Sequence, residues 1–315
     1  PAYNAEHTVA KTIEALIKQN YPKDLFDITV IDDGSTDNTG NIIKKYPVQH
    51  ARQSNKGPAT ARNLGAKLTK SEILLFTDAD CVPSADWIRE MIRPFTDPKI
   101  MAVKGAYIGG QRELMARFSQ LEFEERFEML KKVEYIDMVD TYSAGFRRNI
   151  FEKMGGFDTS FPEANSEDLD LSYRMSYAGH KMVFNPFATV GHLNHPDSIS
   201  RYAKIKFSRG YWRMVVYKRF PGKAVKDTYT PQTLKLQILA FLLIAGSIPF
   251  TAVAPAYGVY MLILSVAIFI LLSIPFALMA LKKDPLLAFL SPAFLFLRAV
   301  SIGSGALWGV LRTKG

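Results

Sequence analysis

Two acidic clusters follow apolar runs in the first third of the chain. Asp32–Asp33 comes after Phe26–Ile31, and Asp78–Ala79–Asp80 comes after Ile73–Thr77. A loop after a strand can turn two such carboxylates into one cleft, and oxygen ligands of this kind suit Mg²⁺ or Mn²⁺. The alternative for Asp78–Asp80 is a solvated turn, because an isolated Asp-x-Asp pattern is common. Two acidic clusters at neighbouring strand ends favour a functional site.

The segment Asp32–Thr39 has a second interpretation as a turn that leads into a helix, with Ser35 or Asp37 as the N-cap. A cap does not need two leading carboxylates. A buried aspartate that accepts hydrogen bonds from a ribose or a base is the functional alternative.

A third acidic cluster is Ser166–Glu167–Asp168. With Ser166 as the predicted N-cap, both acids lie in the first turn of a helix that ends before Gly179. The helix dipole favours an ionised carboxylate there, and a general base must be ionised. The alternative is that both acids only stabilise the helix by complementing its dipole. That would explain the presence of one acid better than the presence of two.

These acids need a scaffold in which strands and helices alternate. Such alternation predicts an α/β fold with a mostly parallel sheet and helices on both faces. Ligands of these sheets bind at the carboxyl ends of the strands. The helix 111–133 either packs on the sheet or touches the membrane, and we favour packing on the sheet. The other expected helices are 9–17, 58–68 and 84–95, and the expected strands are 26–31, 73–77 and 100–107.

The last third of the chain is typical of a membrane protein. No Lys, Arg, Asp or Glu occurs in the 46 residues from Leu236 to Leu281, and one crossing needs about 20 apolar residues. Pro255 divides this run, which predicts a transmembrane hairpin over 236–281 rather than a buried core helix. A third apolar segment, 286–311, carries Arg298. It either spans or lies against the hairpin with Arg298 facing a polar partner, and we favour a third span.

The net charge of +9 is concentrated in one block. Residues 1–198 hold 24 Lys and Arg against 28 Asp and Glu, a net of −4, while 199–235 hold 10 against 1, a net of +9. A broadly basic nucleic-acid-binding domain is therefore excluded. We expect a globular domain over 1–198, a basic amphipathic interfacial segment over 199–235 and a membrane domain over 236–315.

Charge and cysteine content also indicate the compartment. Lysines flank the hairpin on both sides and its turn is uncharged, which predicts that both ends are cytoplasmic. The single cysteine, Cys81, excludes an internal disulfide framework and a thiolate-rich zinc site. We expect an integral membrane protein with a cytoplasmic N-terminal domain, at the cell membrane if the source is a prokaryote.

Five motifs in order give a resemblance to a known family. Together they resemble family 2 glycosyltransferases with the GT-A fold, over about residues 1–230, and the hairpin resembles the membrane-anchored and processive branches of that family. The expected fold is a GT-A domain, with its first strand truncated before Pro1, followed by transmembrane helices. The motifs are Pro1–Ala2–Tyr3–Asn4 with Glu6, Asp32–Asp37, Asn55–Lys56–Gly57 with Ala61–Arg62–Asn63, Asp78–Asp80, and Ser166–Asp168.

The resemblance implies roles for the residues in these motifs. Asp168 would be the general base, with Glu167 as a backup. Asp80 would bind the metal on the diphosphate, with Asp78 beside it and near the ribose. His192 would complete the metal site or contact a phosphate; the alternative for His192 and its neighbour His195 is a structural or solvated loop histidine. The nucleoside and nucleotide side would be lined by Ala2, Tyr3, Glu6, Asp33, Asn55, Gly57 and Arg62.

Two further segments concern the acceptor and the diphosphate. Gly145, in a segment that resembles an acceptor-side wall, would allow close approach of a sugar; a tight turn into a helix is the alternative. Arg209–Gly210–Tyr211–Trp212–Arg213 stands where processive members carry Gln-x-x-Arg-Trp, but it lacks the Gln and reverses the last pair. Arg209 or Arg213 would pair with the diphosphate and Trp212 would stack on a sugar. An interfacial helix is the alternative.

The predicted function is that of an inverting, Mg²⁺- or Mn²⁺-dependent glycosyltransferase. Its donor would be a nucleotide-diphosphate sugar, with a UDP-sugar favoured over a GDP-sugar, and its acceptor a lipid-linked or membrane-proximal glycan. A processive polysaccharide synthase is the nearest alternative, and a lipid-phosphate monoglycosyl transferase is another. A non-catalytic membrane scaffold or sugar-nucleotide sensor is the alternative of a different class, and the complete acidic set argues against it.

Overall fold

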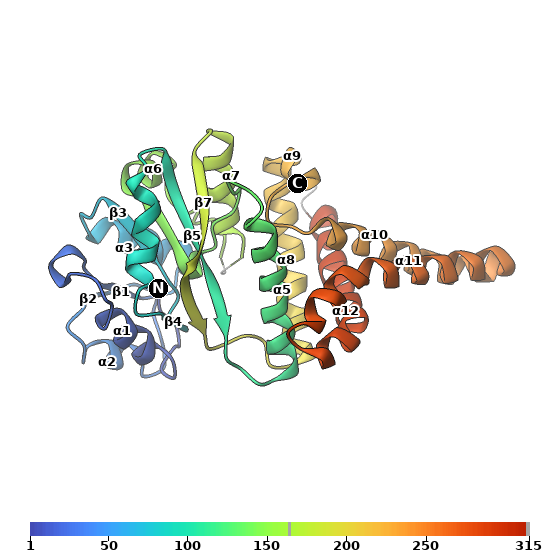
Figure 1. Cartoon of the computed structure of the whole chain (residues 1–315), viewed down its shortest axis with the longest axis horizontal. Helices are drawn as coiled ribbons and strands as arrows, with labels where there is room; N and C mark the ends of the chain where they lie inside the picture. Colours follow the sequence, from blue (N-terminus) through green and yellow to red (C-terminus); the bar gives the residue numbers. More distant parts are fainter. Residues whose placement is uncertain (163–164, 313–315) are drawn as a thin grey trace. The chain divides into compact units, whose positions relative to one another are not determined.

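The computed structural model describes residues 1–162 and 165–312, which pack as two units (Figure 1). The first unit contains residues 1–111 and 130–195, and the second contains 112–129 and the chain from 196 onward. The division therefore differs from the expected boundary at 198, because a segment from the middle of the N-terminal region packs with the C-terminal helices.

The first unit contains two sheets. A parallel pair joins β1 (Thr29–Asp32) to β2 (Gln49–Arg52). The second sheet has the order β3-β6-β5-β7-β4. Its strands are β3 (Ile73–Phe76), β4 (Cys81–Pro83), β5 (Ile100–Gly109), β6 (Ala144–Arg147) and β7 (Lys181–His192).

The five-stranded sheet is mixed, and the expectation of a mostly parallel sheet is wrong. β5 and β7 run parallel, whereas β3–β6, β5–β6 and β4–β7 are antiparallel. The strand β6 enters between β3 and β5 against their direction, through a short 3-10 turn over Thr141–Ser143. Hydrophobic patterning indicates where a strand forms but carries no information about its direction.

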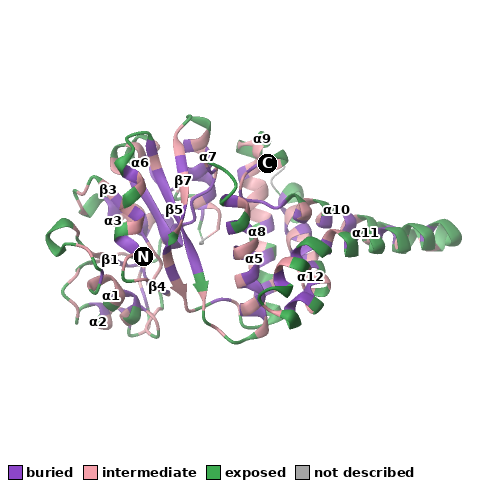
Figure 2. Cartoon of the chain, viewed as in Figure 1, coloured by how far each residue is buried: buried purple, intermediate pink, exposed green. Residues whose placement is uncertain are grey.

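Helices flank these sheets. The structure confirms the predicted helices α1 (Val9–Ile17) and α3 (Pro58–Leu68). The predicted helix 84–95 is shorter, because Pro94 cannot continue an α-helix: α4 covers Trp87–Ile92 and a 3-10 turn covers Arg93–Thr96. Figure 2 shows that β5 is largely buried, as is β6, whereas β2 is exposed. The remaining elements are a 3-10 turn at Lys23–Leu25, α2 (Thr39–Ile43), α6 (Arg148–Lys153) and α7 (Glu167–Tyr177).

A lysine lies in the core of the first unit. Lys104 on β5 is fully buried, forms an ion pair with Asp140 and donates to Tyr142 Oη at 3.0 Å. Its ammonium group also lies 4.7 Å from the centre of the Tyr142 ring. A buried ammonium group depends on such partners, because burial without a counter-charge is costly.

Replacing Lys104 with Met should lower the free energy of unfolding by about 3–5 kcal/mol, because Asp140 is left as a buried charge without its cation. Urea unfolding of the full chain in detergent, followed by circular dichroism, measures this. The double variant Lys104→Met/Asp140→Asn removes both charges and should recover most of the loss. A single variant as stable as the native chain would contradict the importance of this pair.

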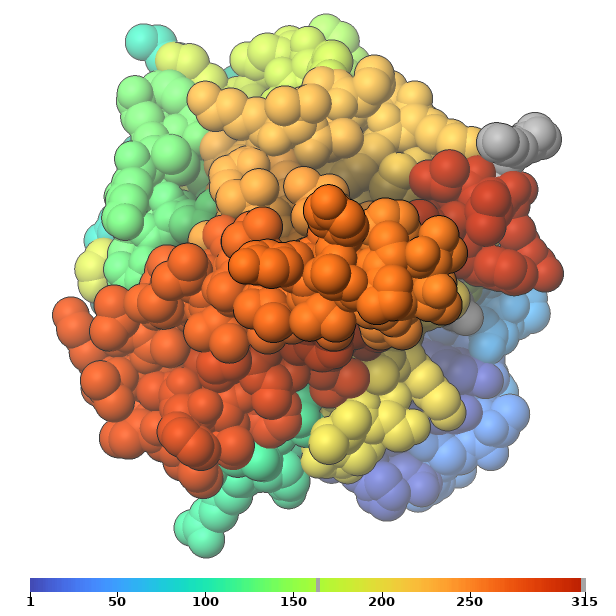
Figure 3. Space-filling model, turned by 90° about the vertical axis from the view of Figure 1, so that its right-hand side faces the viewer, coloured from blue at the N-terminus to red at the C-terminus, as the bar shows by residue number. Residues whose placement is uncertain are grey.

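The second unit is helical. Three of its helices, α10, α11 and α12, are long and apolar enough to cross a membrane. Figure 3 faces the joined ends of α10 and α11, which are drawn in orange, and Figure 2 shows that this end is exposed. The helices are α5 (Leu114–Leu130), α8 (Ile199–Arg219), α9 (Pro221–Val225), α10 (Gln232–Val253), α11 (Pro255–Leu281) and α12 (Pro285–Arg312).

One face of α5 packs against other helices of the second unit. Its side chains Met115, Phe118 and Leu121 join a core with residues of α8, α10, α11 and α12. The ring of Phe118 lies 5.8 Å from that of Tyr202 and 5.5 Å from that of Phe276. A helical stripe predicts that one face is buried, but it does not identify the surface that covers it.

Candidate active site

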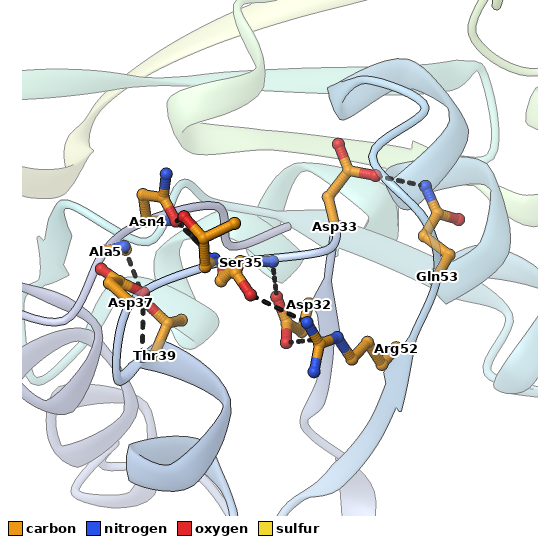
Figure 4. Close-up of polar contacts among 10 residues, drawn as sticks. Asn4, Ala5, Asp32, Asp33, Ser35, Asp37, Thr39, Arg52 and Gln53 are labelled. Carbon is orange, nitrogen blue, oxygen red and sulfur yellow. Dashed lines mark hydrogen bonds and ion pairs between the residues drawn. The ribbon is translucent and has the colours of Figure 1, made fainter.

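The loop after β1 holds Asp33 among donors from the chain itself. Asp33 Oδ1 accepts from Gln53 Nε2 at 2.7 Å and from the Lys56 amide at 2.9 Å, and Oδ2 accepts from the Gly57 amide at 2.9 Å (Figure 4 shows the Gln53 contact). Asp33 therefore fixes the loop that precedes α3, on which Asn55 is exposed. Its predicted contact with a nucleoside would use the remaining acceptor capacity of the carboxylate.

Gly57 shows why this loop needs a glycine. Its φ of +88° lies in the left-handed region, and a Cβ here would lie 2.9 Å from the carbonyl oxygen of Pro162. The backbone of the loop before α3 therefore lies close to the backbone of Pro162, in the segment before α7.

The N-terminal residues lie beside β1. The Ala2 amide donates to Ile31 O and the Asp33 amide donates to Ala2 O, both at 2.8 Å, so Ala2 pairs in parallel with the end of β1. Tyr3, which follows, is 48% exposed and free to contact a ligand that lies over this edge. The predicted nucleoside-binding loop and Asp33 are thus adjacent in the fold.

Glu6 ties the N-terminal loop to the start of α2. Glu6 Oε2 accepts from the Asn38 amide at 3.0 Å, and the Glu6 amide donates to Asp37 Oδ2 at 3.2 Å. Asp37 Oδ1 also accepts from the Thr39 amide at 3.0 Å (Figure 4), but the N-cap position of α2 is Asn38 and not Ser35 or Asp37 as predicted. In this structure Glu6 positions the loop, and a direct contact with the donor stays a prediction.

Arg62 connects two of the acidic clusters. Its guanidinium is buried and donates from Nη2 to Asp78 Oδ1 and from Nη1 to Glu167 Oε1, both at 2.7 Å. Burial acts to lower the pKa of Arg62, but Asp78 and Glu167 outweigh it and raise that pKa above its usual value. The side chain predicted to line the nucleotide thus joins α3, the end of β3 and the start of α7.

Glu167, which is buried, and Asp168, which is half-buried, are adjacent acids at the start of α7. Burial and the neighbouring Asp168 charge raise the pKa of Glu167 to about 7, against the opposing effect of Arg62. Burial likewise raises the pKa of Asp168. The Asp168 carboxylate accepts from the amides of Thr141 at 3.4 Å and Leu169 at 2.8 Å. Glu167 is held by a cation and Asp168 by backbone amides, so Asp168 is the better placed of the two to accept a proton.

Ser166 differs from its prediction. It precedes α7 as expected, but among the described residues its side chain makes no capping hydrogen bond. Its φ of +70° is left-handed, a conformation that is uncommon for a residue with a side chain. The backbone of Ser166, rather than a side-chain cap, turns the chain so that Glu167 and Asp168 begin the helix.

The antiparallel pairing of β4 and β7 brings His192 to the Asp-x-Asp motif. Cys81 is paired with His192, and His192 Nε2 lies 3.6 Å from Asp80 Oδ2. Burial acts to raise the pKa of Asp80, but hydrogen bonds from His192 and Asn194 outweigh it and lower that pKa. The His195 ring packs against the His192 ring, and the two ring centres lie 4.2 Å apart. The predicted pair of ligands is therefore adjacent although 112 residues separate it in sequence.

The donor set at this place fits a divalent cation. Ligand atoms of Asp80, Cys81 and His192 lie within 4.8 Å of one another. Burial and the charges of Asp78 and Asp80 raise the pKa of Cys81, which keeps it a thiol and leaves a carboxylate and an imidazole as donors. His192 Nδ1 is buried and has no hydrogen-bond partner among the described residues. Asp78, also a predicted ligand, is instead paired with Arg62.

The role expected for Gly145 is wrong. Gly145 lies inside β6 and pairs with both β3 and β5. The space of a Cβ is occupied by core atoms, with Leu75 Cδ2 at 3.0 Å and Met91 Cε at 3.2 Å. Gly145 therefore allows the strand to pack on the core, and it forms neither an acceptor surface nor a turn.

The predicted acceptor and diphosphate contacts on α8 belong to the second unit. Arg209 is exposed, Arg213 donates to Thr230 Oγ1 at 3.2 Å, and the Trp212 ring packs edge-on against Tyr211 at 5.1 Å. Their roles toward a diphosphate or a sugar stay predictions.

Sequence reasoning missed an aromatic and cationic cluster behind the site. The rings of Tyr107 and Tyr142 stack at 3.4 Å, Tyr107 lies 4.7 Å from the His192 ring, and Lys104 contacts Tyr142. The one signal for this cluster was a lysine in the otherwise apolar run 100–107, which is unusual in a buried strand.

The fold and the arrangement of acids define the class of protein. The mixed sheet with flanking helices, an Asp-x-Asp motif after β3 and an acidic pair at the start of α7 are those of a GT-A glycosyltransferase domain. Residues 1–155 match the family described as Glycosyl transferase family 2. This part of the chain is therefore a family 2 glycosyltransferase domain with the GT-A fold.

Relatives of known name agree with this classification. The chain is 28% identical over 208 residues to "Probable glycosyltransferase YdaM" of Bacillus subtilis (strain 168), covering 60% of this chain and 48% of that protein. It is 27% identical over 196 residues to "Poly-beta-1,6-N-acetyl-D-glucosamine synthase" of Staphylococcus aureus (strain COL), covering 59% and 47%. The chain thus spans about half the length of the curated relatives it matches.

A solved structure shares the fold over the whole chain. It is described as "Mannosyltransferase PcManGT from Pyrobaculum calidifontis in complex with GDP-Man and Mn2+", with a TM-score of 0.62 and 18% identity, covering 100% of this chain and 86% of that one.

Proposed function

We propose that this chain is an inverting, metal-dependent glycosyltransferase that acts at a membrane. The observation that carries the proposal is Arg62, which holds the strand-end acid Asp78 and the helix-start acid Glu167 on one guanidinium. Arg62 thereby joins α3, the end of β3 and the start of α7 in one site. Asp80 and His192, which could bind a metal, lie near Asp78, and the candidate base Asp168 is next to Glu167 in sequence.

Each group would have a defined part in the reaction. An acceptor hydroxyl attacks the anomeric carbon opposite the leaving group, and Asp168 takes its proton. The bond from the anomeric carbon to the phosphate oxygen breaks, and its electron pair leaves with the diphosphate. A divalent cation held by Asp80 and His192 would neutralise the developing charge on that diphosphate. A single displacement of this kind inverts the anomeric configuration.

The donor and acceptor follow from the same site. The edge formed by Ala2, Tyr3 and the loop fixed by Asp33 would receive the base and ribose of a nucleotide-diphosphate sugar. The solved structure with GDP-Man supports a nucleotide-diphosphate sugar as the donor. We favour a UDP-sugar donor and a lipid-linked or membrane-proximal glycan acceptor, with the domain on the cytoplasmic face.

A processive polysaccharide synthase is the second candidate. The similarity to "Poly-beta-1,6-N-acetyl-D-glucosamine synthase" favours it, whereas the departure from Gln-x-x-Arg-Trp in α8 argues against it. The length of the product separates the two, because a processive enzyme makes long chains even when acceptor is in excess.

A donor panel tests the proposal. The full chain in lipid nanodiscs is incubated with UDP- and GDP-sugars, Mn²⁺ or Mg²⁺, and membrane lipid extract, and products are identified by mass spectrometry. We expect transfer of one sugar from donors of one base, with an inverted anomeric centre. Binding of nucleotide sugars without release of nucleoside diphosphate from any donor would instead support the sugar-nucleotide sensor.

A further inference from the structure

The helix α8 cannot lie in the hydrocarbon of a membrane. Between Ile199 and Arg219 it carries seven Lys and Arg and no Asp or Glu, and Lys204 and Arg209 are exposed. A cation at the centre of a bilayer costs about 2.5–3.5 kcal/mol on insertion scales. This helix therefore lies outside the apolar layer or at its surface.

The helix α12 packs directly along α8. A Cβ on Gly305 would collide with the carbonyl of Phe207, and a Cβ on Gly210 would collide with the carbonyl of Ile302. One turn further, a Cβ on Gly309 would lie 2.9 Å from Tyr211 O. Backbones this close share the same depth in a membrane, and Figure 1 shows α8 and α12 side by side.

The contact extends toward the middle of α12 through buried charges. Arg298 is 1% exposed, donates to Gln237 Oε1 at 2.9 Å and lies 3.4 Å from Glu122 Oε1. Lys206 on α8 lies 2.8 Å from the other oxygen of Glu122. From Arg298 to Gly309 the helix rises about 17 Å. At one end of this length Arg298 contacts polar and charged groups of α10 and α5, and at the other end Gly305 and Gly309 lie against the backbone of α8.

The burial of α12 also differs from that of the hairpin. In an apolar 18-residue window of each helix, 44% of the residues are buried in α12, compared with 17% in α10 and 22% in α11. All ten residues from 297 to 306 are buried or half-buried. Protein contacts thus cover the middle of α12, whereas Phe289, Leu307 and Leu311 nearer its ends are exposed.

The end of the hairpin is attached to the same group of helices. Arg117 and Asp284 form an ion pair, as do Glu124 and Lys283, so α5 holds the connection between α11 and α12. α5, α8 and α12 therefore form one layer from which α10 and α11 project.

We propose that α12 lies at the membrane surface in a layer with α5 and α8, and that α10 and α11 are the described helices that enter the bilayer. This placement replaces the third span favoured by composition. It does not depend on the proposed function, because it follows from packing within the second unit.

Cysteine labelling in membrane vesicles tests this placement. Single cysteines replace Lys204 on α8, Tyr257 at the hairpin turn and Leu311 at the end of α12; Tyr257 and Leu311 are 75% and 63% exposed. A membrane-impermeant maleimide is applied to the full chain in right-side-out and in inverted vesicles. We expect Lys204→Cys and Leu311→Cys to be labelled from one side and Tyr257→Cys from the other.

The native chain, whose Cys81 is buried, gives the background labelling. A third span predicts instead that Leu311→Cys and Tyr257→Cys react from the same side. That result, labelling of Leu311→Cys from neither side, or labelling of all three from one side would overturn the proposal.

Discussion

Replacing Asp168 with Asn should lower kcat for sugar transfer by about 10²- to 10⁴-fold, the usual contribution of a general base. The side chain keeps its size and can still accept from the amides of Thr141 and Leu169, but it can no longer take a proton. The Kd for the nucleoside diphosphate should not change, because Asp168 faces the acceptor in the proposed reaction. Turnover is measured by nucleoside diphosphate release and binding by calorimetry.

The pH dependence supplies an independent readout. Burial raises the pKa of Asp168, and the adjacent Glu167 has a pKa of about 7. The base works only when ionised, so kcat/KM of the native chain should fall as the pH is lowered, and the fall should begin at a higher pH than an ordinary aspartate would give. The residual activity of Asp168→Asn should lack this fall.

A matched control is Glu152→Gln, which alters an exposed acid on α6 that pairs with Arg148. It should leave kcat and the pH profile unchanged. An Asp168→Asn variant that turns over within tenfold of the native chain, with the same pH profile, would falsify the assignment of the base.

Local sequence patterns identified the elements but not their long-range contacts. The helices α1 and α3 follow from apolar spacing and from Pro58 at a first turn, both of which are local properties. The mixed direction of the sheet does not follow, because β6 is placed between β3 and β5 by its packing. The same limit applied to α5, whose apolar stripe indicated burial but not the partner.

The site shows the same division between chemistry and placement. Acid types at strand ends and at a helix start indicated metal and base chemistry from the sequence alone. The ion pair of Arg62 with Glu167 joins residues 105 positions apart, and no spacing rule predicts it. The prediction for Gly145 was wrong because a glycine has more than one possible cause. It suggests a turn or the approach of a ligand, but here a tightly packed strand requires the absence of a side chain.

Removing the carboxylate of Asp80 should have the largest effect on the proposed metal chemistry. Asp80→Ala is expected to lower kcat/KM by about 10³-fold, which corresponds to the several kcal/mol that a metal ion contributes to charge stabilisation. Chelation of the native chain by EDTA should cause a similar loss, which Mn²⁺ reverses. His192→Ala should weaken Mn²⁺ binding less, because a neutral imidazole contributes no charge to the site.

Direct measurement of the metal separates this role from a structural one. Electron paramagnetic resonance of Mn²⁺ titrated into the chain with nucleoside diphosphate reports binding without turnover. The control is Asp86→Ala, which removes a half-buried acid that pairs with Arg89 in the same domain. Asp80→Ala should bind Mn²⁺ weakly and gain little activity from it, while Asp86→Ala behaves as the native chain. If Asp80→Ala kept full Mn²⁺ binding and full stimulation, the cation would have to lie elsewhere, and the 3.6 Å approach of His192 to Asp80 would be only a contact between strands.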